Sequence, residues 1–227
     1  MENTGNVLCT YNLKNGRKIM KILGIVGSNR KKGNSYLLLK EMSRNLPEIE
    51  VKIIQVAELK IKPCKLCFKV CAKKPYQCII KDDFEMLFAE MKSADGIIIA
   101  CPFYFYIPSK FQPFLERLSC LDYFTQKKYG AGHNLLTDKP CLLVTISASG
   151  SSFNAFQILH HLQEFALMLY MQPVTTDFWP YIGFSAKGGN IHKGSILKET
   201  EVIEKAKKAM GLLIREVEKR KKAINSV

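Results

Sequence analysis

The chain has 227 residues, which is enough for one well-buried domain. Hydrophobic residues make up 47% and charged residues 24%, the composition of an ordinary globular protein. The net charge of +14 comes with no recognised DNA- or RNA-binding motif, so we expect no nucleic-acid partner. No apolar run reaches the roughly 20 residues of a membrane span, and the N-terminus lacks a signal-peptide pattern. We therefore expect a cytoplasmic protein with no membrane partner.

Residues 1–18 are polar and without periodicity, which predicts a flexible leader before a single domain at 19–227. A nearly continuous apolar run at 22–26 predicts the first strand of a parallel sheet. A Gly-Ser loop and a helix over 35–46 follow it. Further strands are expected at 51–56, 96–100, 141–146 and 174–178, and further helices at 83–94, 110–121, 154–171 and 199–222.

Short apolar strands that alternate with amphipathic helices predict an α/β fold. We expect a doubly wound, five-stranded parallel sheet of flavodoxin type, with helices on both faces. In such a sheet, ligands bind where the strands end, near the point at which the strand order reverses. The loops that leave the strands are therefore the places to look for a site.

The loop at residues 27–35 leaves the first strand and enters a helix. Its free N–H groups and the helix dipole would attract an anion such as phosphate. It lacks both the P-loop and the dinucleotide-binding glycine patterns. The alternative is a simple strand-to-helix turn with a Ser or Asn cap. The candidate ligands in this loop are Ser28, Arg30, Gly33, Asn34 and Ser35.

Two more strand-exit loops have ligand-type chemistry. Aromatic side chains that could flank a flat ring follow the third strand, at Pro102, Phe103, Tyr104 and Phe105. Small residues that let backbone N–H groups approach a polar ring edge follow the fourth, at Ser147, Ala148, Ser149 and Gly150. The alternative for the aromatic loop is that Phe103, Phe105 and Ile107 alternate inward as core. His133 and His192 lie in loops and could touch a ligand, whereas His160 and His161 lie in a helix.

Four of the eight cysteines fall in one short segment with the spacing Cys64-x2-Cys67-x3-Cys71-x6-Cys78, read as an irregular loop. In a reducing compartment, clustered cysteines favour a metal or redox role over disulfides. Thiolates this close repel one another unless a metal neutralises them. Three states stay open: a [4Fe–4S] cluster, structural zinc, or reduced thiols without metal. Cys101 and Cys141 lie in apolar runs as core residues, and Cys9 and Cys120 form no pattern.

Residues 20–35, 64–83 and 102–117 resemble the NADPH-dependent FMN reductase and iron–sulfur flavoprotein family of the flavodoxin-like superfamily. The resemblance implies bound FMN, with phosphate in the first loop and the isoalloxazine between the second and third. It implies NAD(P)H as electron donor, and no catalytic side chain, because the flavin carries the chemistry. The chain departs from the family in having Glu116 before Arg117 where Asp is common. It also has three residues between Cys67 and Cys71, where the iron–sulfur relatives usually have two.

The expected function is an FMN-binding oxidoreductase that moves electrons between NAD(P)H or a reduced carrier and a flavin- or quinone-type acceptor. A [4Fe–4S] cluster at the four cysteines is an optional part of this expectation. The first alternative is a non-catalytic flavin and iron–sulfur electron carrier between protein partners. The second is a cysteine-rich regulatory or metal-binding protein that has lost the flavin. Partners would be a small redox substrate or a carrier protein, and we expect a homo-oligomer, either dimer or tetramer.

Overall fold

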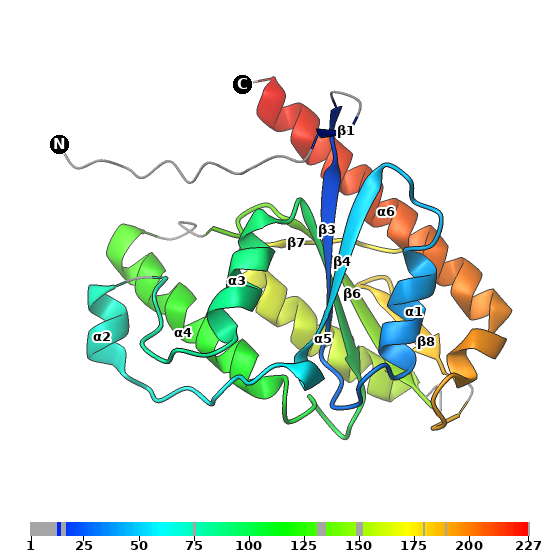
Figure 1. The fold of residues 1–227 in the computed structure, drawn as a ribbon, viewed down its shortest axis with the longest axis horizontal. Coiled ribbons are helices and arrows are strands. Elements are labelled where there is room, and N and C mark those ends of the chain that lie inside the picture. The colour runs from blue at the N-terminus through cyan, green and yellow to red at the C-terminus, as the bar shows by residue number, and fades with distance from the viewer. Residues whose placement is uncertain are drawn as a thin grey trace.

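The computed structural model describes residues 13–14, 17–74, 76–130, 135–148, 152–178, 180–188 and 190–226. A twisted parallel sheet stands at the centre, with helices on either side of it (Figure 1). Within the described ranges, no helix has the length and apolar character needed to cross a membrane.

The strands of the sheet follow the order β4-β3-β5-β6, with β7 and β8 both beside β6, and every pairing is parallel. β3 is the first strand of this sheet in the chain, and its sheet neighbours are the next two strands, β4 on one side and β5 on the other. The strand order therefore reverses at β3. This confirms the doubly wound, flavodoxin-like arrangement. The strands are β3 (Met20–Val26), β4 (Ile49–Gln55), β5 (Gly96–Pro102), β6 (Pro140–Ser147), β7 (Gln172–Pro173) and β8 (Phe184–Lys187).

The fifth position of the sheet differs from the strand predicted at 174–178. It is divided between β7, which pairs with the start of β6, and β8, which pairs with its end. Between them the chain loops out at Thr176, whose hydroxyl donates to the carbonyl oxygens of Phe178 (2.9 Å) and Gly183 (3.1 Å). These local bonds compete with strand pairing, as Thr side chains often do. The predicted strand is therefore wrong in position, although the fifth place in the sheet is filled.

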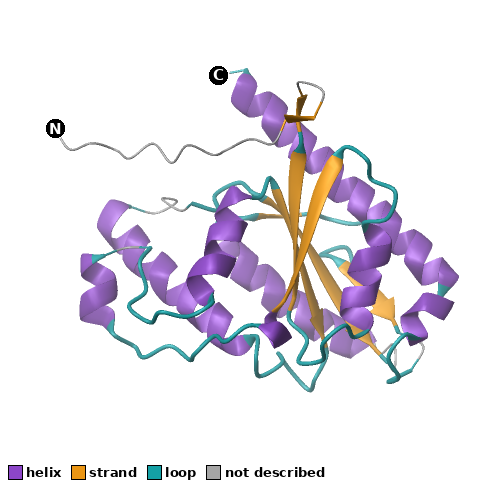
Figure 2. Cartoon of the chain, in the orientation of Figure 1, coloured by secondary structure: helices purple, strands orange, loops and turns teal. Residues whose placement is uncertain are grey.

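Helices cover both faces of the sheet, as predicted (Figure 2). One face packs against α1 (Asn34–Met42) and α6 (Thr200–Asn225). The other packs against α3 (Phe84–Ser93), α4 (Gln112–Tyr129) and α5 (Ser152–Met168). Helix α4 runs well past its predicted end and stops before Gly130, whose positive φ of 101° suits a helix terminus.

The sequence predicted that the cysteine segment is an irregular loop, but part of it is helical. Residues Phe68–Lys73 form a short helix, α2. Helix α2 packs on α4, where the ring centroids of Phe68 and Phe124 lie 5.6 Å apart. Through this ring contact α2 packs on the buried Phe124, although Phe68 itself is 49% exposed. The many lysines of the segment left no apolar pattern that would have predicted the contact.

The start of the chain is described only in part. Leu13–Lys14 (β1) and Arg17–Lys18 (β2) pair as antiparallel strands within the stretch expected to be a flexible leader. Residues 1–12 and Cys9 among them lie outside the described residues.

Candidate functional site

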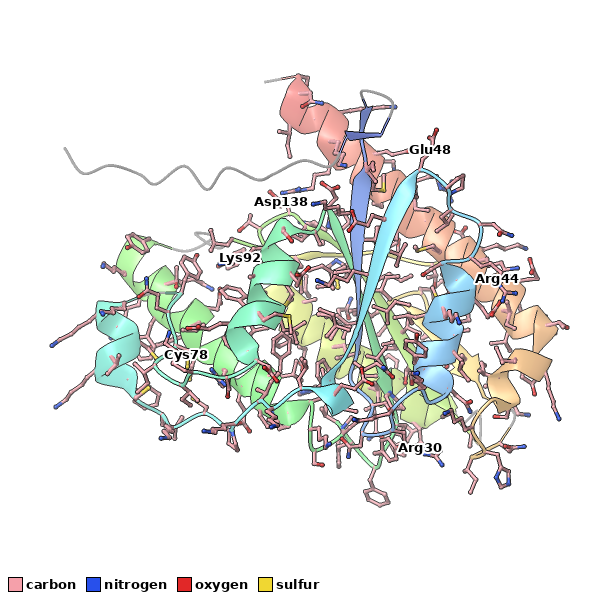
Figure 3. The ribbon with its side chains drawn as sticks, in the orientation of Figure 1. Arg30, Arg44, Glu48, Cys78, Lys92 and Asp138 are labelled. Carbon is pink, nitrogen blue, oxygen red and sulfur yellow. The ribbon has the colours of Figure 1, made fainter. Side chains whose placement is uncertain are left out.

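Three loops meet at the carboxyl edge, the edge of the sheet at which the parallel strands end. Arg30 lies at this edge and Asp138 and Lys92 at the opposite one (Figure 3). Backbone bonds join the loop starts: Gly27 N–H donates to Ala100 (2.9 Å) and Phe103 N–H to Ile146 (3.3 Å). The structure thus brings together the loops that the sequence selected separately.

The first loop has the features of an anion site. The side chains of Ser28 and Ser35 are each only 3% exposed. Helix α1 begins at Asn34 without a side-chain cap, so the predicted Ser or Asn cap is not found. Within the described part of the chain, the N–H groups of residues 34–36 have no acceptor. Unpaired N–H groups at a helix start, beside buried hydroxyls, suit a phosphate.

Arg30 and Asn34 bind the loop that contains His192, one of the two loop histidines predicted to reach a ligand. Arg30 Nη1 donates to the carbonyl oxygen of Ile191 (2.7 Å). Asn34 Nδ2 donates to Ser195 Oγ (2.8 Å) and to the His192 carbonyl (3.1 Å), and its Oδ1 accepts the Gly194 N–H (2.8 Å). Asn34 therefore positions this loop, residues 190–195, beside the start of α1.

The first loop is also fixed to the chain that follows the aromatic loop. A Cβ on Gly27 would lie 2.5 Å from the ring of Phe111, so this close approach requires glycine. Asn29 Nδ2 donates to Ser109 Oγ, and Asn29 Oδ1 accepts the Lys110 N–H, both at 3.1 Å. Movement of either loop would therefore disturb the other.

The aromatic loop divides between core and surface. Phe103 and Ile107 pack against the core, and Pro102 is half-buried. Tyr104 and Phe105 are exposed, by 43% and 83%. The inward alternation considered for this loop is therefore wrong for Phe105. Exposed aromatic rings beside the anion site can cover one side of a flat ligand.

The third loop is described only at its start. Ser147 is buried and Ala148 is half-buried. The Ser147 carbonyl accepts the N–H of Gly188 (2.9 Å), which places the end of β8 beside this loop. Ser149 and Gly150, predicted to contact the ring edge, lie outside the described residues, as does His133.

The four clustered cysteines come together with a fifth from α4. Cys64 Sγ lies 3.6 Å from Cys120 Sγ, and the Cys67 and Cys71 thiols are hydrogen-bonded. Cys120 interacts electrostatically with each of the other four. We call Cys64, Cys67, Cys71, Cys78 and Cys120 the five-thiol set. Cys120 was missed because it lies 42 residues after Cys78, and only the packing of α2 on α4 joins them.

Burial favours the protonated form of two of these thiols, Cys71 and Cys120. It raises the pKa of Cys71 to about 12, with a further contribution from Cys67, and that of Cys120 to about 11, with a further contribution from Cys64. Among the described residues, no three His, Cys, Asp or Glu side chains are placed to hold a metal ion. An iron–sulfur cluster separates its ligands more widely than a single ion does, and soft thiolates are its usual ligands. The donor chemistry of the five-thiol set fits such a cluster.

Two other cysteines are core residues, as predicted. Cys101 and Cys141 are fully buried in β5 and β6, and burial raises the pKa of both thiols. Neither lies among the five thiols, and a thiol in such an apolar site is unreactive.

Arg117 on α4 holds the end of the cysteine segment. Its Nη1 contacts both carboxylate oxygens of Asp82 at 2.7 Å, and its Nη2 donates to the Ile80 carbonyl (3.0 Å). The two side chains are 1% and 5% exposed. Burial raises the pKa of Asp82, but hydrogen bonds from Arg117 and from two backbone N–H groups outweigh it and hold that pKa below its usual value. This supports a structural role for Arg117.

A groove between α4 and α5 links the thiols to the carboxyl edge. One cavity of ≈ 750 Å³ is lined by Cys64 and Cys120, and another of ≈ 670 Å³ by Tyr106 of the aromatic loop. Both cavities are lined by Gln112, His161 and Glu164. His161 thus has a place at a cavity that its helical position alone did not predict.

Comparison with known proteins is consistent with these features. An iron–sulfur flavoprotein of Methanocaldococcus jannaschii is 41% identical over 88 residues, which are 38% of this chain and 45% of that protein. The chain thus spans less than half the length of each of the curated relatives it matches.

Among solved structures, RosB with a bound intermediate has a TM-score of 0.61 at 13% identity, covering 89% of this chain and 81% of the other. An apo NADH:FMN oxidoreductase has a TM-score of 0.54 at 16% identity, covering 86% and 88%. These two likenesses concern the fold. Residues 20–182 match the family described as NADPH-dependent FMN reductase, and the chain belongs to that family.

Proposed function

We propose that this protein is an FMN-dependent oxidoreductase that moves electrons between NAD(P)H or a reduced carrier and a flavin- or quinone-type acceptor. The observation that carries the proposal is the anion site at the start of α1, with Ser28 and Ser35 buried beside unpaired N–H groups. Membership of the NADPH-dependent FMN reductase family supports the same cofactor. The acceptor would be a small redox molecule or a carrier protein.

The described residues fit FMN by their chemistry. Ser28, Ser35 and the first N–H groups of α1 would hold the phosphate, with the charge of Arg30 nearby. Tyr104 and Phe105 would cover the isoalloxazine. When bound, FMN supplies the ability to accept a hydride and to release electrons singly. The side chains of this chain then bind and orient, and no proton-transferring residue is needed.

We further propose that the cysteine segment holds a [4Fe–4S] cluster. The grouping of thiols supports this, as does the likeness to an archaeal iron–sulfur flavoprotein. The cluster would lie on the α4 side of the sheet, joined to the aromatic loop by the groove between α4 and α5.

The phosphate contribution to flavin binding tests the proposal directly. Charge-assisted bonds are worth roughly 1.5–3 kcal/mol each, so FMN should bind at least about tenfold more tightly than riboflavin. Ser28→Ala should weaken FMN binding and leave riboflavin binding unchanged. Ser43→Ala is the matched control, because Ser43 bonds to Leu39 at the far end of α1. Equal affinity of the unmodified protein for FMN and riboflavin would refute the proposed site.

A non-catalytic electron carrier is the second candidate, and the five-thiol set is the observation that favours it. Steady oxidation of NADPH or NADH by the purified, FMN-loaded protein would support the enzyme. Reduction that depends strictly on a reduced iron–sulfur carrier protein would support the carrier.

A further inference from the structure

Cys120 lies beside the compact cysteine segment. Its Sγ is 3.6 Å from that of Cys64, and it also interacts electrostatically with Cys67, Cys71 and Cys78. It is half-buried, as are Cys64 and Cys67, and with Cys64 it lines the cavity between α4 and α5. A thiol so placed can reach both its neighbours and an incoming metal centre.

Helix α4 holds Cys120 between two fixed points. Three residues before it, Arg117 binds Asp82 and the Ile80 carbonyl, which anchors the chain just after Cys78. Four residues after it, Phe124 packs on Phe68, which anchors α2. Residues three and four apart lie on one face of a helix, so all three side chains face the cysteine segment. The position of Cys120 relative to that segment is therefore built into the packing.

Cys71 is placed differently. The three-residue spacing puts it one turn after Cys67, whose carbonyl oxygen accepts the Cys71 N–H (3.2 Å). It is 4% exposed, the most buried of the five thiols, and like Cys78 (8% exposed) it belongs to the hydrophobic core. Cys71 is held within α2 as Cys120 is within α4, but Cys120 lines the cavity between α4 and α5 and Cys71 does not. Cys64 and Cys78 lie in non-helical chain, whose backbone can adjust to a cluster.

We propose that Cys120 is a ligand of the cluster, together with Cys64, Cys67 and Cys78, and that Cys71 remains a packing residue. This inference rests on the proposed iron–sulfur function. Each of the four thiols would lose its proton to solvent as its sulfur bonds to an iron. Cys64 lies in a loop, so its side chain can turn away from Cys120 and bind a separate iron. The ligand set would then combine three cysteines of the segment 64–78 with one cysteine of α4, which lies outside that segment.

Iron and acid-labile sulfide, measured after anaerobic reconstitution of the full chain, test the ligand set. The unmodified protein should contain about four of each per chain, as a [4Fe–4S] centre requires. Cys120→Ser and Cys64→Ser should each reduce both to background and remove the visible absorption of the cluster. Cys71→Ser should retain both. Ser119→Ala, the neighbouring position on α4, is the matched control and should retain both.

The outcomes separate this inference from the proposed function. Full iron in Cys120→Ser with loss in Cys71→Ser would overturn the role of Cys120 and leave the cluster standing. An unmodified protein without stoichiometric iron would overturn the cluster and the ligand together. FMN content and the denaturation midpoint, measured on each variant, show whether it has folded. If Cys120→Ser does not fold, Cys120→Ala takes its place, and retention of iron by that variant would equally overturn the proposal.

Discussion

The Arg117–Asp82 pair gives the sharpest prediction of stability. Arg117→Met would keep most of the side-chain volume on α4 and remove the guanidinium. Asp82 would then keep a carboxylate that is 5% exposed with no cation beside it. It would retain only the N–H groups of Lys62 (2.9 Å) and Phe84 (3.1 Å). An uncompensated buried charge is among the few single changes that destabilise a domain strongly.

The expected loss follows from the burial of both partners. Removing one member of a buried ion pair costs about 3–5 kcal/mol of unfolding free energy. For a domain of this size each kcal/mol moves the melting temperature by about 2–4 °C, so the melting temperature should fall by about 6–20 °C. Asp82→Asn/Arg117→Met, which leaves no buried charge, should be less destabilised than Arg117→Met alone. Chemical denaturation of the single and double variants measures both differences.

The pH dependence gives a second check on the same pair. The folded-state pKa of Asp82 is lowered, so its stabilising contribution is present above the unfolded pKa of about 4. That contribution is lost as the pH falls through the folded pKa. The unmodified protein should therefore lose more stability than Asp82→Asn on acidification below about pH 4. A double variant no more stable than Arg117→Met, with parallel pH profiles, would refute this account of the pair.

Three further predictions concern the loops at the carboxyl edge. Gly27→Ala should lower the unfolding free energy, measured in denaturant, by about 1–3 kcal/mol, because the added Cβ would lie 2.5 Å from Phe111. Gly211→Ala is the control: a Cβ there would meet no neighbouring atom within 4 Å and should stabilise α6 by up to about 1 kcal/mol. Asn34→Ala removes three hydrogen bonds, so amide hydrogen exchange should become faster in the loop after β8 and stay unchanged in β3. Equal protection of that loop in the variant and in the unmodified protein would contradict this prediction. Tyr104→Ala should weaken FMN binding by about two- to tenfold, with little effect on folding because the side chain is 43% exposed; an unchanged Kd would place the ring elsewhere.

Much of the fold could be predicted because the buried strands carry a strong local signal. The strands β3, β5 and β6 are nearly continuous apolar runs, which is typical of parallel strands that are buried on both faces of a sheet. The prediction of the fifth strand was wrong because this place in the sheet is filled by two short strands, which a turn around Thr176 separates. Each strand is too short to show periodicity, and only pairing with β6 defines it.

The site could be predicted where its residues directly follow a strand. Ser28 and Tyr104 are such residues, because the end of a parallel strand fixes their place in space. Asn34 was predicted to cap the helix, but it is the first residue of α1 and its side-chain partners lie about 160 residues away in the chain. Contacts of that separation depend on how α6 and β8 pack, and no local pattern encodes them.

Helix α4 is the element that relates the two proposed centres. Just before it, Phe111 and Lys110 lie against the loop of the anion site, and its first residue, Gln112, lines the groove. Its middle holds Arg117 and Cys120 against the cysteine segment. Because one rigid helix spans both, a change at either end can move the other without touching its ligands. Loss of iron in Arg117→Met with Cys120 intact would therefore reflect positioning, and comparison with Cys120→Ser separates that effect from ligation.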